Sequence, residues 1–227
     1  MTNAGHEGAP VPVVAVRGEA ELEVEPELAE LSLAVQAKAP DRKEAMQLLV
    51  KRLNATRDLL NGFGEAVERS EGSLWVHPVW TSDRNGRAKK IAGYEGRVPI
   101  TVTVSTFDLL DQMVLALTGL EEIELRGPEW RLRPANPAYL EVREKAVAAA
   151  VQRARQYAAA LGSTLVDLLE LSDLGLGGGG FSGRLQVGYA SSMMSGGGDA
   201  QLDLQPQPQT VNASVEARFT ITPPTLD

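Results

Sequence analysis

Alternating apolar and polar positions identify the strands of this chain. Residues 18–25 place small or apolar side chains on one side and four glutamates on the other. Successive strand side chains point to opposite faces, so this period of two predicts a sheet with one buried and one solvated face. Residues 31–35 and 210–221 repeat the alternation. The glutamates should lie in water without converging on a cation, and these segments should join one largely antiparallel sheet.

Short apolar runs bounded by turn residues predict further strands. These runs are residues 11–16, 73–80, 93–105, 123–133 and 164–171. Asp83-Arg84-Asn85-Gly86 is a turn signal that should join residues 73–80 and 93–105 into a hairpin. Pro78 and Pro99 should occupy edge or bulge positions, because proline cannot donate a ladder hydrogen bond. Gly127-Pro128 should interrupt the strand at 123–133.

Residues 136–162 are predicted to form one long helix against which the rest of the chain packs. Asn136 is a good N-cap, Pro137 suits the first helical position, and Gly162 can end the helix in a left-handed conformation. Glu141 and Lys145 are spaced for an ion pair along the helix, and Arg153 and Arg155 suit its negative end. Its predicted buried stripe is Leu140, Val147, Val151, Ala154, Ala158 and Leu161.

Two more helices follow from caps and apolar spacing. Residues 41–62 begin with Asp41 and Glu44, which resemble a capping box, and the stripe is Ala45, Leu48, Leu49, Leu53, Leu59 and Leu60. Gly62 and Gly64 should end this helix. A shorter helix should be capped by Ser105 or Thr106 and stop at Gly119.

The composition changes at about residues 174–209, which are rich in glycine and proline. Such a long segment without regular structure is unusual within a compact domain, so it is expected to be mobile or ordered by a partner. The strand at 210–221 still needs a sheet to join. The sequence therefore predicts a disordered N-terminus at 1–10 and a single α+β domain over 11–222, with an insertion at 174–209 and long helices on one face of the sheet.

Composition excludes several classes of protein. The 227 residues are 43% hydrophobic, contain no cysteine and carry a formal charge of −8. Disulfides and thiolate chemistry are therefore impossible, and the net negative charge disfavours nucleic acid. No apolar run approaches the roughly 18 residues of a membrane span. Residues 1–10 have no apolar signal segment, which predicts a cytoplasmic protein, or a periplasmic or secreted one if a leader was removed.

No pattern of residues predicts catalysis. Gly175–Gly180 satisfies G-x-G-x-x-G, but residues 181–184 have no helical stripe to open the helix that a dinucleotide site requires. His6 and His77 are isolated from each other and from cysteine, so neither a base nor a metal site is expected. The serines near the glycine run have no neighbouring base; they are Ser182, Ser191, Ser192 and Ser195. We expect no catalytic, cofactor-binding or metal-binding residues, and no enzyme.

Trp130 lies among Arg126, Arg131 and Arg133, a combination that could form an aromatic and basic surface for nucleic acid. In a strand, however, Arg131 and Arg133 share one face while Trp130 and Leu132 share the other. The pattern therefore favours a solvated face above a core face.

Several segments, taken in order, resemble the SIMPL-domain family, which includes bacterial periplasmic immunogenic proteins and a mammalian kinase-interacting protein. They are Val16-Arg17-Gly18-Glu19-Ala20, Pro26-Glu27-Leu28-Ala29, Gly93-Tyr94, Arg143-Glu144-Lys145-Ala146, Arg153-Ala154-Arg155 and Ala160-Leu161-Gly162. The resemblance spans about residues 11–222. It implies an α+β domain with helices on a sheet, a loop of small residues before the last strand, and self-assembly in some members. It implies no catalytic residues.

Two functions remain open from the sequence. The first is a non-enzymatic, self-associating SIMPL-type protein involved in scaffolding or stress, with an unidentified protein partner as a further option. Homo-oligomers are expected because residues 210–221 contain only Glu216 and Arg218 to protect a sheet edge, and because the insertion adds apolar residues. These are Leu185, Val187, Tyr189, Met193, Met194, Leu202 and Leu204. The second is a small-ligand binder with a pocket between sheet and helices, covered by the 174–209 insertion.

Overall fold

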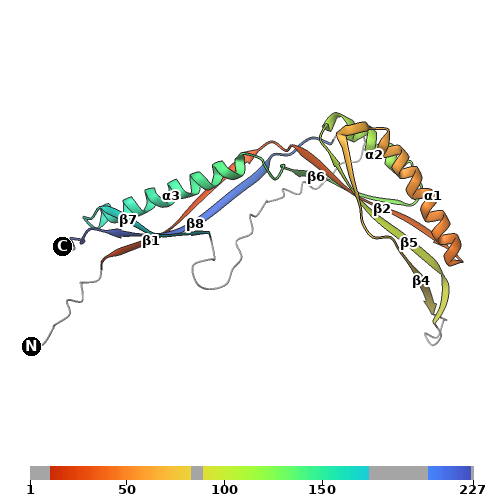
Figure 1. Ribbon diagram of the computed structural model, residues 1–227, viewed down its shortest axis with the longest axis horizontal. Coiled ribbons are helices and arrows are strands. Elements are labelled where there is room, and N and C mark those ends of the chain that lie inside the picture. The colour runs from red at the N-terminus through yellow and green to blue at the C-terminus, as the bar shows by residue number, and fades with distance from the viewer. Residues whose placement is uncertain (1–10, 83–88, 174–203, 226–227) are drawn as a thin grey trace, which may run out of the picture. The chain divides into compact units, whose positions relative to one another are not determined.

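The computed structural model describes residues 11–82, 89–173 and 204–225, which form two compact units (Figure 1). Unit 1 contains the described residues of Met1–Val24, Pro134–Ser192 and Gln209–Asp227. Unit 2 contains those of Glu25–Arg133 and Met193–Pro208. The predicted disorder of residues 1–10, the turn at 83–86 and most of the insertion lie outside the described residues. Both units combine helices with antiparallel strands, so the fold class is α+β, as predicted. That the chain unfolds as a single domain stays a prediction.

Unit 1 is a three-stranded antiparallel sheet with one long helix along one face (Figure 1). Its elements are β1 (Val13–Val24), α3 (Ala138–Ala160), β7 (Leu165–Asp173) and β8 (Gln209–Ile221). The strand order is β1-β8-β7, so the final strand joins strands formed before the insertion, as predicted. The predicted alternation is confirmed in β1, where the glutamates are exposed and Val16 is buried.

The helix α3 lies so close to the sheet that only small residues fit between them. Ala146, Ala150 and Ala154 are fully buried, and a Cβ at Gly18 would lie 2.1 Å from the carbonyl oxygen of Ala146. The predicted stripe is confirmed at Ala154 and Ala158, which are fully buried, and is wrong at Leu140, which is 58% exposed. The other large residues of that stripe flank the contact: Val147 and Val151 are half-buried, and Leu161 is exposed. Burying alanine brings the two backbones together and leaves the larger side chains at the sides.

The ends of α3 follow the predicted caps. The Asn136 Oδ1 atom accepts a hydrogen bond of 2.8 Å from the Ala138 backbone N–H. Gly162 has φ +64°, a left-handed conformation that glycine adopts without a steric penalty. Lys145 and Glu141 form the predicted ion pair at 2.8 Å.

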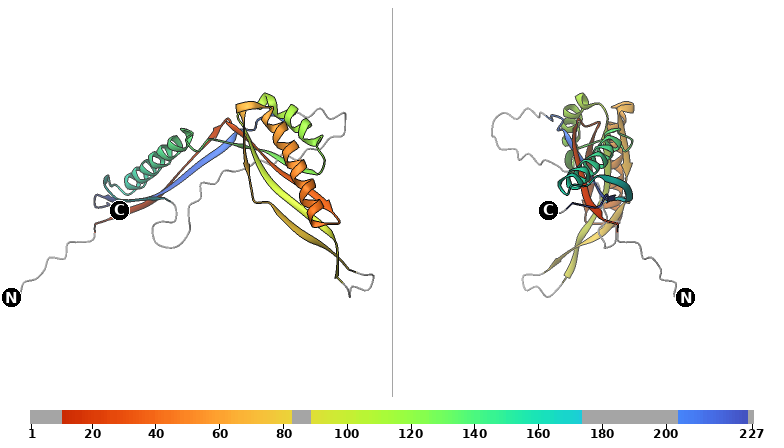
Figure 2. Two further views of the ribbon diagram at one scale, coloured as in Figure 1. Left: turned by 45° about the vertical axis from the view of Figure 1, so that its right-hand side comes forward. Right: turned by 90° about the vertical axis from the view of Figure 1, so that its left-hand side faces the viewer.

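Unit 2 is a second antiparallel sheet, of five strands, covered on one face by two helices (Figures 1 and 2). The order is β3-β5-β2-β6, and β4 also pairs with β5. Its strands are β2 (Leu28–Ala39), β3 (Val67–Glu71), β4 (Trp75–Ser82), β5 (Lys89–Val104) and β6 (Ile123–Arg131). Its helices are α1 (Arg42–Asn61) and α2 (Leu110–Thr118), with short 3₁₀ turns at Gly64–Ala66 and Phe107–Leu109. The prediction of one sheet was therefore wrong, because alternation shows which face is buried but not which sheet a strand joins.

Alternate residues of β2 and β5 form the core of unit 2 against α1 and α2. The largest fully buried side chains here are Leu31, Leu49, Leu60, Ile100, Leu110, Met113 and Leu117. Asp41 caps α1 as predicted, since its Oδ1 atom accepts hydrogen bonds from the backbone N–H groups of Lys43 (2.7 Å) and Glu44 (3.3 Å). Leu204, a residue of the predicted insertion that the structure describes, packs against this core.

Three local predictions in unit 2 have different outcomes. Pro78 lies in the outer strand β4, as expected, and Pro99 lies where β5 changes partner from β4 to β3, opposite Gly72. The interruption at Gly127-Pro128 is confirmed by φ +109° at Gly127 and by a register shift against β2. The predicted cap of the short helix was wrong: Thr106 makes no capping hydrogen bond, and the Ser105 hydroxyl donates to the carbonyl of Ala66 instead.

Candidate functional site

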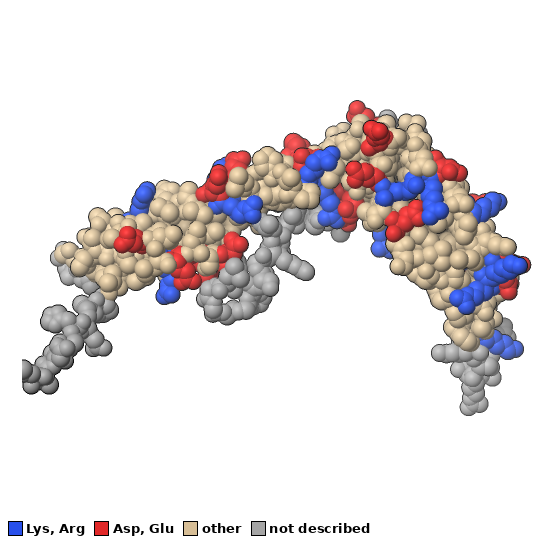
Figure 3. All heavy atoms as spheres, viewed as in Figure 1, with Lys and Arg blue, Asp and Glu red and all other residues tan. Residues whose placement is uncertain are grey.

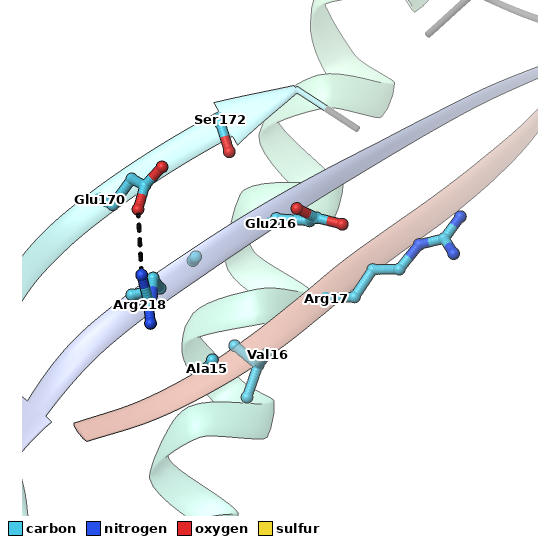
Figure 4. Close-up of a pocket in the computed structure, with 8 residues that line it drawn as sticks. Ala15, Val16, Arg17, Glu170, Ser172, Glu216 and Arg218 are labelled. Atoms are coloured by element: carbon cyan, nitrogen blue, oxygen red, sulfur yellow. Dashed lines mark ion pairs between the residues drawn. The ribbon is translucent and has the colours of Figure 1, made fainter. Parts of the chain in front are cut away.

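The open face of the unit 1 sheet carries a shallow depression of about 450 Å³ (Figure 4). Its lining residues are Ala15, Val16, Arg17, Glu170, Ser172, Glu216, Ala217 and Arg218. The charged side chains come from alternate positions of β1, β8 and β7, and α3 lies behind these strands in the view of Figure 4. The depression is therefore on the face opposite α3. This depression is not the predicted pocket between sheet and helices, because no helix lines it.

The charges of this depression are arranged in rows across the strands. Arg218 Nη1 lies 3.7 Å from Glu170 Oε2, the pair joined by a dashed line in Figure 4. Arg17 Nε lies 2.9 Å from Glu19 Oε1 and donates to the Ser214 hydroxyl at 2.8 Å. The arginines and glutamates are about half exposed, so each pair contributes little to stability. The face offers guanidinium groups, carboxylates and a serine hydroxyl to a charged molecule.

The titratable side chains that line this depression are glutamates and arginines. The lining residues include no histidine, cysteine or lysine beside Ser172. In the part of the chain that the structure describes, no group of three or more His, Cys, Asp or Glu side chains could hold a metal ion.

The strand β7 exposes large apolar side chains on both of its faces. Val166 is 55%, Leu168 53%, Leu169 56% and Leu171 46% exposed. β7 is an outer strand of the unit 1 sheet, and register shifts occur on both sides of its pairing at Leu168. Large exposed apolar side chains along an outer strand are typical of a contact with another protein.

The hairpin of β4 and β5 carries a second exposed apolar pair. Trp80 and Ile91 are opposite each other in register and are 55% and 48% exposed. Lys90 is exposed beside Ile91, opposite Thr81. Because successive side chains of a strand point to opposite faces, Lys90 lies on the face of the hairpin away from Trp80 and Ile91.

His77 lies on the exposed surface of β4. The exposed His77 ring lies 4.6 Å from the Trp75 ring, and its register partner is Glu95. His6, the glycine motif at 175–180 and the four serines near it lie outside the described residues. A catalytic or metal role for His77 remains unexpected; its ring is tilted by 42° against that of Trp75 on an exposed strand surface.

Trp130 and its neighbouring arginines form a core face and a solvated face, as the alternation predicts. Trp130 is 8% exposed and meets the Phe107 ring edge-on at 5.0 Å. Arg131 Nη2 pairs with Glu30 at 3.0 Å and with Glu129 at 2.7 Å. On the face of the described residues seen in Figure 3, acidic and basic side chains are interspersed rather than gathered by sign. This arrangement gives nucleic acid no continuous basic surface in that view.

Sequence reasoning missed the outer strand β7 as a candidate contact surface. The signal was present, because Val166, Leu168, Leu169 and Leu171 leave few polar positions on either face of residues 164–171. Such a pattern predicts a strand covered on both sides. In the structure, α3 packs mainly on β1 and β8 rather than on β7. Among the described residues, the large apolar side chains of β7 therefore stay exposed.

A family model named SIMPL, described as "Protein of unknown function (DUF541)", matches residues 14–219, from β1 to the end of β8. The chain belongs to the SIMPL family. Gly18, where the α3 backbone meets β1, lies in one of the segments that carry the resemblance, and Gly162, which ends α3, lies in another. The family description assigns no activity, so membership supports the fold and gives no catalytic site.

Two proteins with the same name are related to this SIMPL chain. They are 26 kDa periplasmic immunogenic proteins from Brucella melitensis biotype 1 and Brucella abortus, each 28% identical over 171 residues. The match covers 71% of this chain and 66% of each relative, so the chain spans just under two thirds of the relatives' length. A solved chain from Burkholderia cenocepacia, described as an amidohydrolase/peptidase, is 17% identical with a TM-score of 0.24, over 61% of this chain and 35% of its own. A likeness that weak carries no argument about activity.

Among the described residues, no helix is both long enough and apolar enough to cross a membrane.

Proposed function

We propose that this SIMPL protein is a non-enzymatic, self-associating protein that serves as a scaffold, and that β7 forms part of the self-association surface. The observation that carries the proposal is the exposure of four large apolar side chains along one outer strand, Val166, Leu168, Leu169 and Leu171. Covering a half-exposed leucine is worth about 1 kcal/mol, so the four together supply much of the apolar part of a contact.

Residues 210–221 do not form the free sheet edge that the sequence predicts. Those residues form β8, which pairs with β1 on one side and β7 on the other, so its edges are used inside unit 1. The edges left over are those of β1 and β7. Arg153 Nη1 already donates a hydrogen bond to the Arg17 carbonyl of β1. β7 therefore replaces β8 as the edge that supports self-association.

Light scattering tests the proposal directly. We expect the protein at about 10 μM to have a mass at least twice that of one chain, because association depends on protomer concentration. Leu169→Asp should lower that mass by placing a charge in the contact. Leu115→Asp is the matched control, since Leu115 is 62% exposed on α2 and should leave the mass unchanged. A monodisperse monomer for the unmodified chain would refute self-association.

A second candidate function is the binding of a small charged molecule in the depression on unit 1. The observation that favours it is the presence of Arg17, Arg218, Glu170 and Glu216 around one hollow of about 450 Å³. Such a set suits a molecule that carries both a carboxylate and an ammonium group. Unlabelled dipeptides should shift the amide NMR signals of β7 and β8 in the unmodified protein but not in Arg218→Ala. Unchanged spectra at saturating dipeptide would remove this candidate.

The cellular compartment is a separate proposal. The sequence predicts the cytoplasm, or the periplasm if a leader was removed, and the names of the two Brucella relatives favour the periplasm. Fractionation of cells that express the full natural gene should place the protein in the periplasmic fraction. Recovery with a cytoplasmic marker enzyme would restore the first prediction.

A further inference from the structure

One carboxylate of the unit 1 depression has no cationic partner. Arg218 pairs with Glu170 at 3.7 Å. Arg17 pairs with Glu19 at 2.9 Å. Glu216 lies half-buried on the central strand β8, and no dashed line reaches it in Figure 4. Among the described residues, neither an ion pair nor a side-chain hydrogen bond joins Glu216 to a neighbour, so its carboxylate can accept a bound cation.

The neighbours of Glu216 leave room beside this carboxylate. The register places Ser172 of β7 on one side of Glu216 and Arg17 of β1 on the other. Ser172 has a small side chain, and it lines the same hollow of about 450 Å³. A carboxylate and a hydroxyl can both accept hydrogen bonds from an ammonium group, which has three donors. Glu216 and Ser172 therefore suit the ammonium end of a ligand.

Arg218 provides a second anchor, two residues further along the same strand. Its side chain is 61% exposed, and the 3.7 Å between its Nη1 atom and Glu170 Oε2 is an ion pair too long for a hydrogen bond. Ala15, its register neighbour on β1, has a side chain too short to cover it. The guanidinium group can therefore offer two N–H groups to a carboxylate in bidentate geometry.

We propose that the depression binds a dipeptide lying along β8, with the ammonium group at Glu216 and Ser172 and the carboxylate at Arg218. This inference rests on the second candidate function, the binding of a small charged molecule, and assigns the two ends of that molecule. Glu216 selects an amine and Arg218 selects an anion, so a ligand with only one of these charges uses only one anchor.

The spacing of the two anchors sets the length of the ligand. Alternate residues of a strand are about 6.7 Å apart. An extended peptide spans about 3.5 Å per residue, so two residues reach about 7 Å and one residue only about half of that. A dipeptide therefore meets both anchors at once. Because solvent reaches both Glu216 and Arg218, the dissociation constant should be about 1 mM.

Blocking one end of the ligand at a time tests the assignment. The probes are dialanine, N-acetyl-dialanine without the ammonium group, and dialanine amide without the carboxylate, each titrated into the full chain and followed by its amide NMR signals. With the unmodified protein, either block should raise the dissociation constant about tenfold. In Glu216→Gln, acetylation should have no further effect while amidation still weakens binding. In Arg218→Ala, only acetylation should still weaken binding.

A control variant and a length series complete the experiment. Glu21 is exposed on β1, on the same sheet face as Arg17, and does not line the depression. Glu21→Gln removes one carboxylate from this face and should leave all three dissociation constants unchanged. Free alanine and trialanine should bind several-fold more weakly than dialanine. Equal affinity for free alanine would show that the two anchors are not used together.

Each other outcome overturns the inference in a recognisable way. If dialanine moves no signal of the unmodified chain, the candidate function is wrong as well. If dialanine binds and both blocks are tolerated, binding stands and the assignment of its ends is wrong. If the two variants respond in the opposite order, the ligand lies the other way along β8 and the assignment again fails.

The unmodified protein decides the matter if a variant loses its native circular dichroism. Acetylation of the ligand should then abolish the shift of the Glu216 amide signal and keep that of Arg218. Amidation should do the reverse. Loss of both shifts together, or of neither, would contradict the two separate anchors.

Discussion

Residue 18 determines how closely α3 can lie against its sheet. A Cβ there would lie 2.6 Å from the Ala150 backbone nitrogen and 2.7 Å from its Cβ, closer than real side chains come. Because the obstacle includes the helix backbone, α3 would have to move away from β1 to make room. The alanines at 146, 150, 154 and 158 would then lose contact together, since they share this face.

We therefore expect Gly18→Ala to lower the free energy of unfolding by about 2–3 kcal/mol, as overpacking does in a close-packed core. Urea denaturation followed by far-ultraviolet circular dichroism measures this value. Gly119→Ala is the control, because its Cβ would lie 3.3 Å from the Ala116 carbonyl oxygen and 3.8 Å from that of Leu115, and its φ of −75° suits alanine. Equal stability of Gly18→Ala and the unmodified chain would disprove the close contact.

The same residue shows why the predicted buried stripe of α3 was right at Ala154 and Ala158 and wrong at its leucines. A hydrophobicity pattern favours leucine and valine as the buried side, so Leu140 and Leu161 were assigned to the core. Where helix and strand backbones nearly touch, size decides instead, and alanine takes the centre. To predict this contact from the sequence, one would have to recognise that Gly18 lies against the alanines that recur every four residues along the helix, at 146, 150, 154 and 158.

At the scale of elements, the sequence predicts most helices and strands because their patterns are long. The caps of α1 and α3 and the alternation in β1, β2 and β8 are read directly from residues. The strand β3 was missed because Val67–Glu71 has one apolar residue and is held by pairing with β5. The candidate surfaces were missed for a similar reason: the exposure of β7 depends on where α3 lies, which no local pattern records.

An ion pair ties the helix α1 to the strand β3. Arg57 Nε lies 2.9 Å from Glu71 Oε1, and Arg69 lies 3.5 Å from the same oxygen. The hydrogen bond from Arg57 lowers the pKa of Glu71 below its ordinary value of 4.5; burial opposes it, and the charges of Arg57 and Arg69 add to the lowering. The ionised carboxylate is thus favoured in the folded state.

The sign of the pH dependence follows from this lowered pKa. The unfolded chain binds a proton at Glu71 more readily than the folded chain, so the contribution to stability is complete above the unfolded pKa and is lost as pH falls through the folded one. We expect Glu71→Gln to destabilise the protein at pH 7 and to destabilise it less at pH 3. Glu68→Gln, on the same strand, controls for the loss of one charge. A Glu71→Gln effect that stays equal at both pH values would contradict this role.

At the scale of the whole molecule, the chain passes between the two units more than once. Unit 1 takes β1 from the start of the chain, α3 and β7 from beyond residue 134, and β8 from its end, while residues 25–133 belong to unit 2. When unit 2 unfolds, those residues become a long flexible loop between β1 and α3. Closing such a loop costs conformational entropy, so unit 1 should lose stability when unit 2 unfolds.

We therefore expect one cooperative unfolding transition, as for a single domain. All three tryptophans, Trp75, Trp80 and Trp130, are in unit 2, so tryptophan fluorescence follows that unit alone, whereas far-ultraviolet circular dichroism also reports α3 of unit 1. The two signals should change together during denaturation. Leu49→Ala in the core of unit 2 should lower both midpoints equally, with a loss of about 2–5 kcal/mol for a fully buried leucine. Fluorescence that shifts in Leu49→Ala while the α3 signal keeps its original midpoint would show that the two units unfold independently.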